Sequence, residues 1–83
     1  MGAGQLRESL PLFKSAYEID RAHYGDRHPA VATDLQNLGY VLFKLGQKEA
    51  AGEHFRAALE IRSTALGAHH PETKSTRTWA GRC

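Results

Sequence analysis

The chain has 83 residues, of which 41% are hydrophobic and 24% charged, and its formal net charge is +2. This length predicts one small domain, and so mild a charge gives no support to nucleic-acid or membrane binding. The single cysteine, Cys83, excludes an internal disulfide framework. No apolar run approaches the length of a transmembrane helix and the first residues lack a signal-peptide profile, so we expect a cytoplasmic protein that does not bind membranes.

The sequence repeats itself with a period of 42 residues. When the chain is shifted by this length, ten of the 41 aligned pairs are identical. Chance would give roughly two or three identities at ordinary amino-acid usage. The identical pairs are Gly4/Gly46, Gln5/Gln47, Phe13/Phe55, Ala16/Ala58, Glu18/Glu60, Ile19/Ile61, Gly25/Gly67, His28/His70, Pro29/Pro71 and Gly39/Gly81. Such a period is typical of stacked structural repeats.

The first helix is expected over residues 4–24, before Gly25. Pro11 complicates it, because a proline inside a helix removes a backbone hydrogen bond and costs about 3 kcal/mol. We therefore expect this helix to start late, near Leu10, or to bend. With no partner helix before it, it should leave one apolar side under-covered, drawn from Leu6, Leu10, Phe13 and Tyr17.

The second helix is predicted over residues 29–45, where apolar side chains recur with a period of 3.6. They are Val31, Leu35, Leu38, Leu42 and Leu45. Pro29 suits the first helical position, which makes His28 the N-cap, and Gly46 suits a left-handed position just after the helix.

Two more helices follow, at 48–66 and 71–80. Gly67 ends the first of them and Pro71 opens the second. Only Gly46 and Gln47 separate the helix over 29–45 from the helix over 48–66, so these two must be antiparallel neighbours.

The residues of this unit resemble a tetratricopeptide repeat (TPR), in the lengthened 42-residue variety similar to that of kinesin light chains. The size pattern of the family is matched by Leu35, Leu38-Gly39, Leu42, Gly46, Ala51, Phe55 and Ala58. Ser63 stands where the family's usual terminal proline falls. Four segments resemble the kinesin-light-chain type, at residues 35–38, 58–62, 66–67 and 70–71.

This resemblance implies an all-α fold, a short right-handed α-solenoid of stacked helical hairpins. Residues 4–24 would be helix B of a partial repeat, 29–66 a complete repeat, and 71–80 a truncated helix A of a third.

TPR modules bind extended peptides in a groove lined by helix A, and the resemblance implies the same here. The implied groove residues on the second helix are Thr33, Gln36, Asn37, Tyr40, Phe43 and Lys44. Their spacing of three to four residues places them on one side, away from the leucine stripe. Lys44, joined by Lys74 or Arg77 of the last helix, would meet a carboxylate of the peptide. A rival interpretation is that Tyr40 and Phe43 simply pack against the adjoining hairpin.

The C-terminal end leaves two interpretations open. Its last 22 residues carry four basic side chains and one acidic one, which suits either an acidic ligand or a solvated tail. Trp79 stands where the equivalent of Asn37 should be, and it could anchor a partner or cap the core. Nucleic-acid binding has little support, because no aromatic side chain except Trp79 accompanies the basic ones.

Neither a metal site nor a catalytic site is indicated, and we expect no cofactor and no enzyme. His69 and His70 are adjacent, but further ligands at zinc-binding spacing are missing. His28 and His70 each precede a helix-opening proline, so a structural role explains both. No nucleophile and base are paired in the sequence.

The leading hypothesis is therefore a noncatalytic protein-interaction module that binds a peptide of a partner protein, acidic if the basic end takes part. The alternative is a self-association element, which forms a homodimer or a helix-swapped oligomer through its unpaired terminal helices.

Overall fold

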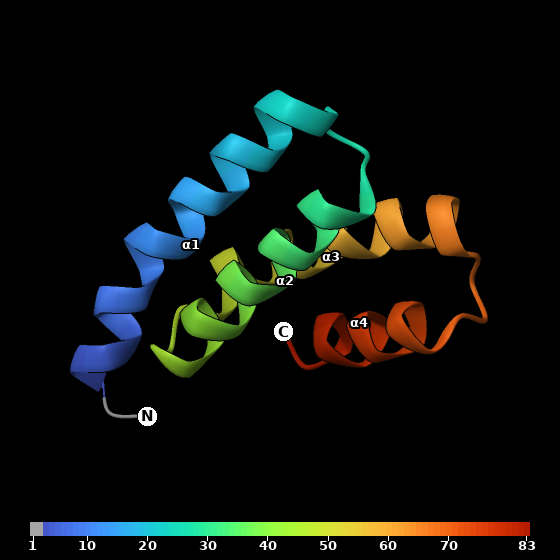
Figure 1. Ribbon diagram of the computed structural model, residues 1–83. Coiled ribbons are helices and arrows are strands. Elements are labelled where there is room, and N and C mark those ends of the chain that lie inside the picture. The colour runs from blue at the N-terminus through green and yellow to red at the C-terminus, as the bar shows by residue number, and fades with distance from the viewer. Residues whose placement is uncertain (1–2) are drawn as a thin grey trace.

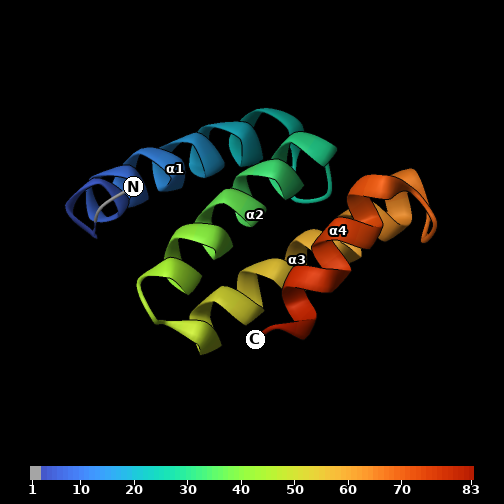
Figure 2. The same ribbon diagram turned by 90° about the horizontal axis from the view of Figure 1, so that it is seen from below.

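The computed structural model describes residues 3–83, and over that range it contains four α-helices and no strand. They are α1 (Ala3–Tyr24), α2 (Pro29–Lys44), α3 (Lys48–Leu66) and α4 (Pro71–Gly81). Helices that follow one another in the chain pack against each other, so α2 and α3 lie between α1 and α4 (Figures 1 and 2). The predicted all-α fold is confirmed, and the predicted helix ranges agree with the observed ones to within one residue, apart from the late start near Leu10 that Pro11 suggested for the first helix.

Histidine caps the start of both α2 and α4. The backbone amide of Ala30 donates to Nδ1 of His28 at 3.0 Å, and that of Glu72 donates to Nδ1 of His70 at 3.2 Å. Each ring nitrogen satisfies an amide that the first helical turn leaves without a partner. The predicted N-cap at His28 is confirmed, and His70 caps α4 in the same way 42 residues later.

The α2–α3 turn depends on a left-handed glycine. Gly46 has a φ of 87°, a conformation that side chains disfavour. The Gln47 amide then donates to the Leu42 carbonyl oxygen at 2.9 Å, which satisfies a carbonyl of the last turn of α2. The chain thereby reverses within three residues, and α3 returns along α2.

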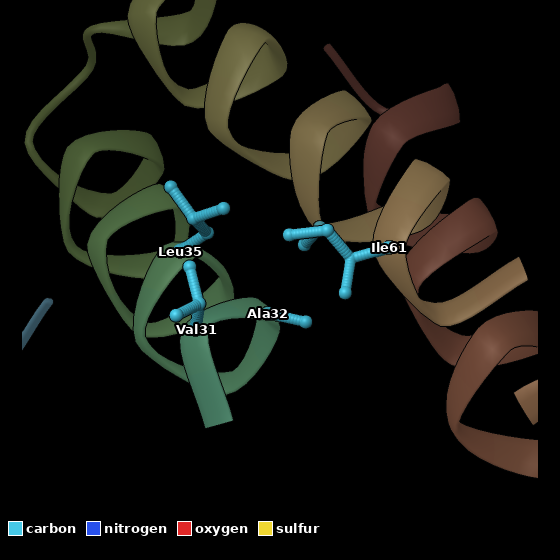
Figure 3. Packing of buried hydrophobic residues seen from close by; sticks show 5 residues of the cluster. Val31, Ala32, Leu35 and Ile61 are labelled. Carbon is cyan, nitrogen blue, oxygen red and sulfur yellow. The ribbon is translucent and has the colours of Figure 1, made fainter. Parts of the chain in front are cut away.

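The core between α2 and α3 has two clusters. Figure 3 shows the first, in which side chains of α2 face Ile61 of α3. The buried residues of this cluster are Val31, Ala32, Leu35, Ala58 and Ile61. The second contains Leu42, Ala51 and Phe55. Gly39 lies against the Phe55 ring, since a Cβ built on it would be 2.9 Å from Cε1. Two helices approach closely here because one of them has no side chain at the contact.

The expected late start of α1 is wrong, because the helix runs unbroken through Pro11. Pro11 is exposed, so water can reach the Arg7 carbonyl that loses its amide partner. Leu6 lies in the first turns of α1, which a start near Leu10 would have left out of the helix, and it is only 7% exposed. Burial of this apolar side chain favours the helix over its full length.

The side of α1 that stays uncovered is not the one expected from sequence. Leu6 is buried, and Leu10, Phe13 and Tyr17 are half-buried. The uncovered apolar residues are Leu12 and Ile19, which are 71% and 67% exposed. The sequence expectation failed because α2 packs on the very side that was assigned to the missing helix.

Candidate functional site

The six predicted groove residues of α2 lie along one side of that helix, and none is fully buried. Thr33, Tyr40 and Lys44 are exposed, and Gln36, Asn37 and Phe43 are half-buried. We call this side, together with the parts of α4 that touch it, the α2–α4 surface. Its chemistry is set by two groups of side chains, one around Arg62 and one around Trp79.

Arg62 comes from α3 and reaches between α2 and α4. Its Nη1 donates to Oγ1 of Thr76 at 2.7 Å and also to Oε1 of Gln36. Its Nη2 donates to Oγ1 of Thr33 at 3.3 Å. The Thr76 hydroxyl in turn donates to Oε1 of Gln36 at 2.6 Å. This network ties three helices together beneath the predicted groove.

The positive charge of Arg62 has no anionic partner in the described chain. The side chain is only 6% exposed, and its three hydrogen-bond partners are neutral. The ion pairs found within residues 3–83 lie elsewhere, at Arg21–Asp26 and Arg27–Glu60. A buried charge that only neutral groups solvate is costly, and an anion nearby would offset that cost.

Trp79 is the centre of an aromatic cluster at the other end of the α2–α4 surface. Its ring stacks on Phe55, with centroids 5.6 Å apart, and meets the edges of Tyr40 and Phe43 at 5.7 and 5.6 Å. Trp79 therefore covers the second core cluster. Both aromatic side chains predicted to contact the peptide pack against α4, as the rival interpretation required, and Tyr40 still keeps 37% of its surface exposed.

Three cations surround this cluster. Lys44 lies over the Tyr40 ring at 5.6 Å, Lys48 over Phe43 at 5.8 Å, and Arg82 over Trp79 at 4.9 Å. The side chains of Lys44, Lys48 and Arg82 are exposed. The end of the surface thus offers aromatic faces and accessible positive charge side by side.

Lys74 and Arg77 are not brought to the α2–α4 surface. They follow Ala32 and Leu35 by one 42-residue period, and those two residues face α3 in the core. Arg77 instead donates to the carbonyl oxygen of Ala68 at 3.4 Å, in the loop before α4. The residues of α4 that do meet α2 are Thr76 and Trp79.

Arg62 and Arg82 were counted from sequence only among the four basic side chains of the C-terminal end, and not among the groove residues. A signal for Arg62 was available, because it follows Phe55 by seven residues and Ala58 by four, and so falls near the buried stripe of α3. Arg82 follows Tyr40 by 42 residues, which would have assigned it to the same side of its helix.

A hollow of about 390 Å³ lies on a different part of the molecule, between α1 and α3. Its apolar lining is formed by Leu35, Ala57 and Ile61. Two ion pairs also line it, Arg21–Asp26 with an N–O distance of 2.5 Å and Arg27–Glu60 with one of 3.1 Å. Its charges are already paired within the chain. It therefore offers a charged ligand less than the unpaired cations of the α2–α4 surface do.

Over residues 3–83, no group of three or more His, Cys, Asp and Glu side chains could hold a metal ion. In the same range, none of the helices is both long and apolar enough to cross a membrane.

The fold is that of an α-solenoid of helical hairpins, and its α2–α4 surface is available for contacts. The family model for the tetratricopeptide repeat matches residues 1–63 of the sequence. The chain belongs to the tetratricopeptide repeat family. Members of this family generally act as protein–protein interaction modules, and they are typically noncatalytic. The likeness to the kinesin-light-chain variety remains a resemblance in sequence.

Proposed function

We propose that this chain is a noncatalytic module that binds an acidic peptide segment of a partner protein on the α2–α4 surface. The observation that carries the proposal is Arg62, a buried cation that lies beneath Thr33 and Gln36 and has no counter-ion among residues 3–83. Both of these residues were predicted from sequence to line the groove.

The electrostatics of the surface favour an acidic partner. A carboxylate above Arg62 would supply the missing negative charge, and the low dielectric of the site would strengthen the attraction. Asn37 is half-buried beside this network, and its side-chain amide offers a donor and an acceptor to a peptide backbone.

The aromatic end of the surface would provide the second half of recognition. Tyr40 is part of the Trp79 cluster and remains partly exposed, and Lys44 and Arg82 lie over these rings. An aromatic side chain of the peptide could pack there while neighbouring carboxylates meet the two cations. We therefore propose a peptide with acidic residues on both sides of an aromatic one.

The division of the chain into repeats is part of the same proposal. Residues 4–24 would be helix B of a partial repeat, 29–66 a complete repeat, and 71–80 a truncated helix A. This division is supported by the packing, since α1 contacts α2 as α3 contacts α4. A cytoplasmic location also belongs to the proposal, and it is supported by the single cysteine.

Peptide binding is tested by fluorescence anisotropy with a labelled peptide of this composition. Lys44→Ala/Arg82→Ala should weaken binding about tenfold, or about 1.4 kcal/mol, since each exposed charge contributes up to about 1 kcal/mol. The matched control is Arg7→Ala/Lys14→Ala, which removes two exposed cations from α1 and should leave the affinity unchanged. Equal losses in the two variants, or no binding by the unaltered chain, would contradict the proposal.

Self-association through the terminal helices is the second candidate function. It is favoured by the exposure of Leu12 and Ile19 on α1, since most of these two large apolar side chains is in water. The solution mass decides it, and a mass of 9.2 kDa at every concentration would remove the candidate.

A further inference from the structure

The solvent-exposed side of α1 corresponds, one repeat later, to a side of α3 that α2 covers. We call Leu12, Ala16 and Ile19 the open face of α1. Forty-two residues later, Ala58 and Ile61 of α3 are 0% and 5% exposed because α2 packs on them, whereas Ile19 is 67% exposed. Figure 3 shows Ile61 turned toward α2. Two positions of the open face of α1, Ala16 and Ile19, therefore correspond to positions that α2 covers on α3.

The opposite end of the molecule carries the complementary helix. α4 follows α2 by one period, and its Gly81 takes the place of Gly39. A Cβ on Gly39 would meet the Phe55 ring at 2.9 Å, but a Cβ on Gly81 would meet nothing within 4 Å. We call the side of α4 with Lys74, Arg77 and Gly81 its open face. Within residues 3–83, no helix covers this face in the way that α3 covers the corresponding face of α2.

We propose that the open face of α4 in one copy of this chain docks on the open face of α1 in a second copy, in the register in which α2 packs on α3. This deepens the self-association candidate and rests on it. In this register Gly81 lies over the Phe13 ring as Gly39 lies over Phe55. The two half-repeats then form one complete hairpin across the two molecules.

The charges of the two faces support this register. Leu35 lines a hollow with Ala57, Glu60 and Ile61 of α3. Arg77 of α4 follows Leu35 by 42 residues. The three α3 residues are preceded by 42 residues by Ser15, Glu18 and Ile19 of α1. Arg77 would therefore meet Glu18 of the other copy.

Lys74 takes the place of Ala32, which belongs to the same cluster as Ile61. Lys74 would therefore lie over Ile19, its aliphatic stem covering apolar surface while the amino group stays in water.

The arrangement is head to tail, so it differs from a two-fold dimer in a measurable way. Each copy would use two different faces, and each complex would keep one open face at either end. Association would continue beyond the dimer as concentration rises. A two-fold dimer would stop at two copies.

Two variants, each with one blocked face, test this arrangement. Ile19→Glu blocks the α1 face, and Gly81→Leu blocks the α4 face. Both positions are open in the single chain, so both variants should keep the helix content of the unaltered chain, which circular dichroism checks. Sedimentation velocity in reducing buffer, which keeps Cys83 a free thiol, gives the mass.

The unaltered chain should grow past the dimer with concentration, each variant alone should stay at 9.2 kDa, and their equimolar mixture should form a dimer and stop. Lys14→Glu, on another side of α1, should associate as the unaltered chain does. If Gly81→Leu alone dimerises, or if the mixture stays monomeric while the unaltered chain associates, the head-to-tail arrangement is wrong but self-association survives. If the unaltered chain stays monomeric, both are wrong.

Charge reversal tests the register separately. Arg77→Glu and Glu18→Arg should each weaken association, because each places like charges opposite one another. Glu18→Arg/Arg77→Glu in one chain should restore it, because the pair is re-formed with its signs exchanged. Failure of the double variant to recover would overturn the assigned register.

Discussion

At the scale of single residues, the contact between Gly39 and Phe55 is where the packing has least freedom. Phe55 is fully buried and its ring is stacked on Trp79, so it cannot move aside to admit a methyl group. A Cβ at Gly39 would lie 2.9–3.1 Å from three atoms of that ring. The absence of a side chain at position 39 therefore sets how closely α2 and α3 approach.

Gly39→Ala should lower the free energy of unfolding, by up to about 2 kcal/mol. Overpacking a rigid core costs about 1–3 kcal/mol, which outweighs the gain of about 1 kcal/mol in helix propensity. The measurement is urea denaturation in dilute protein. Gly81→Ala is the control, since the same methyl group meets nothing there and should leave stability unchanged or slightly higher. Stabilisation by Gly39→Ala would show that the two helices do not touch at this point.

The sequence predicts Gly39 as a point of close approach, because glycine inside a helix is otherwise unfavourable. It does not predict Arg62 as the buried centre of a network. A long side chain can extend to solvent from most positions, and only the placement of Thr33, Gln36 and Thr76 around it shows that Arg62 stays inside.

At the scale of helices, two carboxyl groups, Asp20 of α1 and Asp34 of α2, interact where these helices pack on each other. Asp34 of α2 is 8% exposed, and its Oδ2 is buried without a hydrogen-bond partner. Burial, together with a smaller effect of a hydrogen bond and charge repulsion from Asp20 of α1, raises the pKa of Asp34 to about 6. The α1–α2 contact should therefore depend on pH.

The sign follows from the direction of this pKa shift. The pKa of Asp34 is higher in the folded chain than its ordinary value of 3.8. Its contribution to stability is therefore fully present below about pH 4 and is lost as the pH rises through about 6.

Asp34→Asn should accordingly raise the free energy of unfolding at pH 7, on the order of 1–2 kcal/mol, and change it little at pH 4. Denaturation at both pH values measures this. Glu53→Gln, at an exposed acidic position of α3, should change stability at neither pH. A loss of stability at pH 7 in Asp34→Asn would mean that the charged form of Asp34 supports the fold.

Sequence periodicity and caps predict the helices well, but they do not predict the packing side of α1. The bounds were set by local signals such as Gly25, Gly67 and the two His-Pro pairs. Which side of α1 faces α2 depends on the angle between the helices, which no local signal carries. This is why Leu12 and Ile19, rather than Leu10 and Tyr17, are the side chains left in water.

At the scale of the whole molecule, the stacking of hairpins decides which parts of distant helices come together. The sequence places Lys74 and Arg77 with the α2 residues, but stacking turns Thr76 and Trp79 toward α2 instead. The predicted residues of α2 lie on an accessible side of that helix. The residues of α4 that adjoin them are Thr76 and Trp79, not the expected Lys74 and Arg77.

The most direct test of the proposed function is an NMR titration of the isotope-labelled chain with the acidic aromatic peptide. We expect the largest shift changes on α2 and α4, at the side-chain amides of Gln36 and Asn37 and at the Trp79 indole N–H. Shift changes concentrated on Arg21, Asp26 and Glu60, around the hollow between α1 and α3, would contradict it.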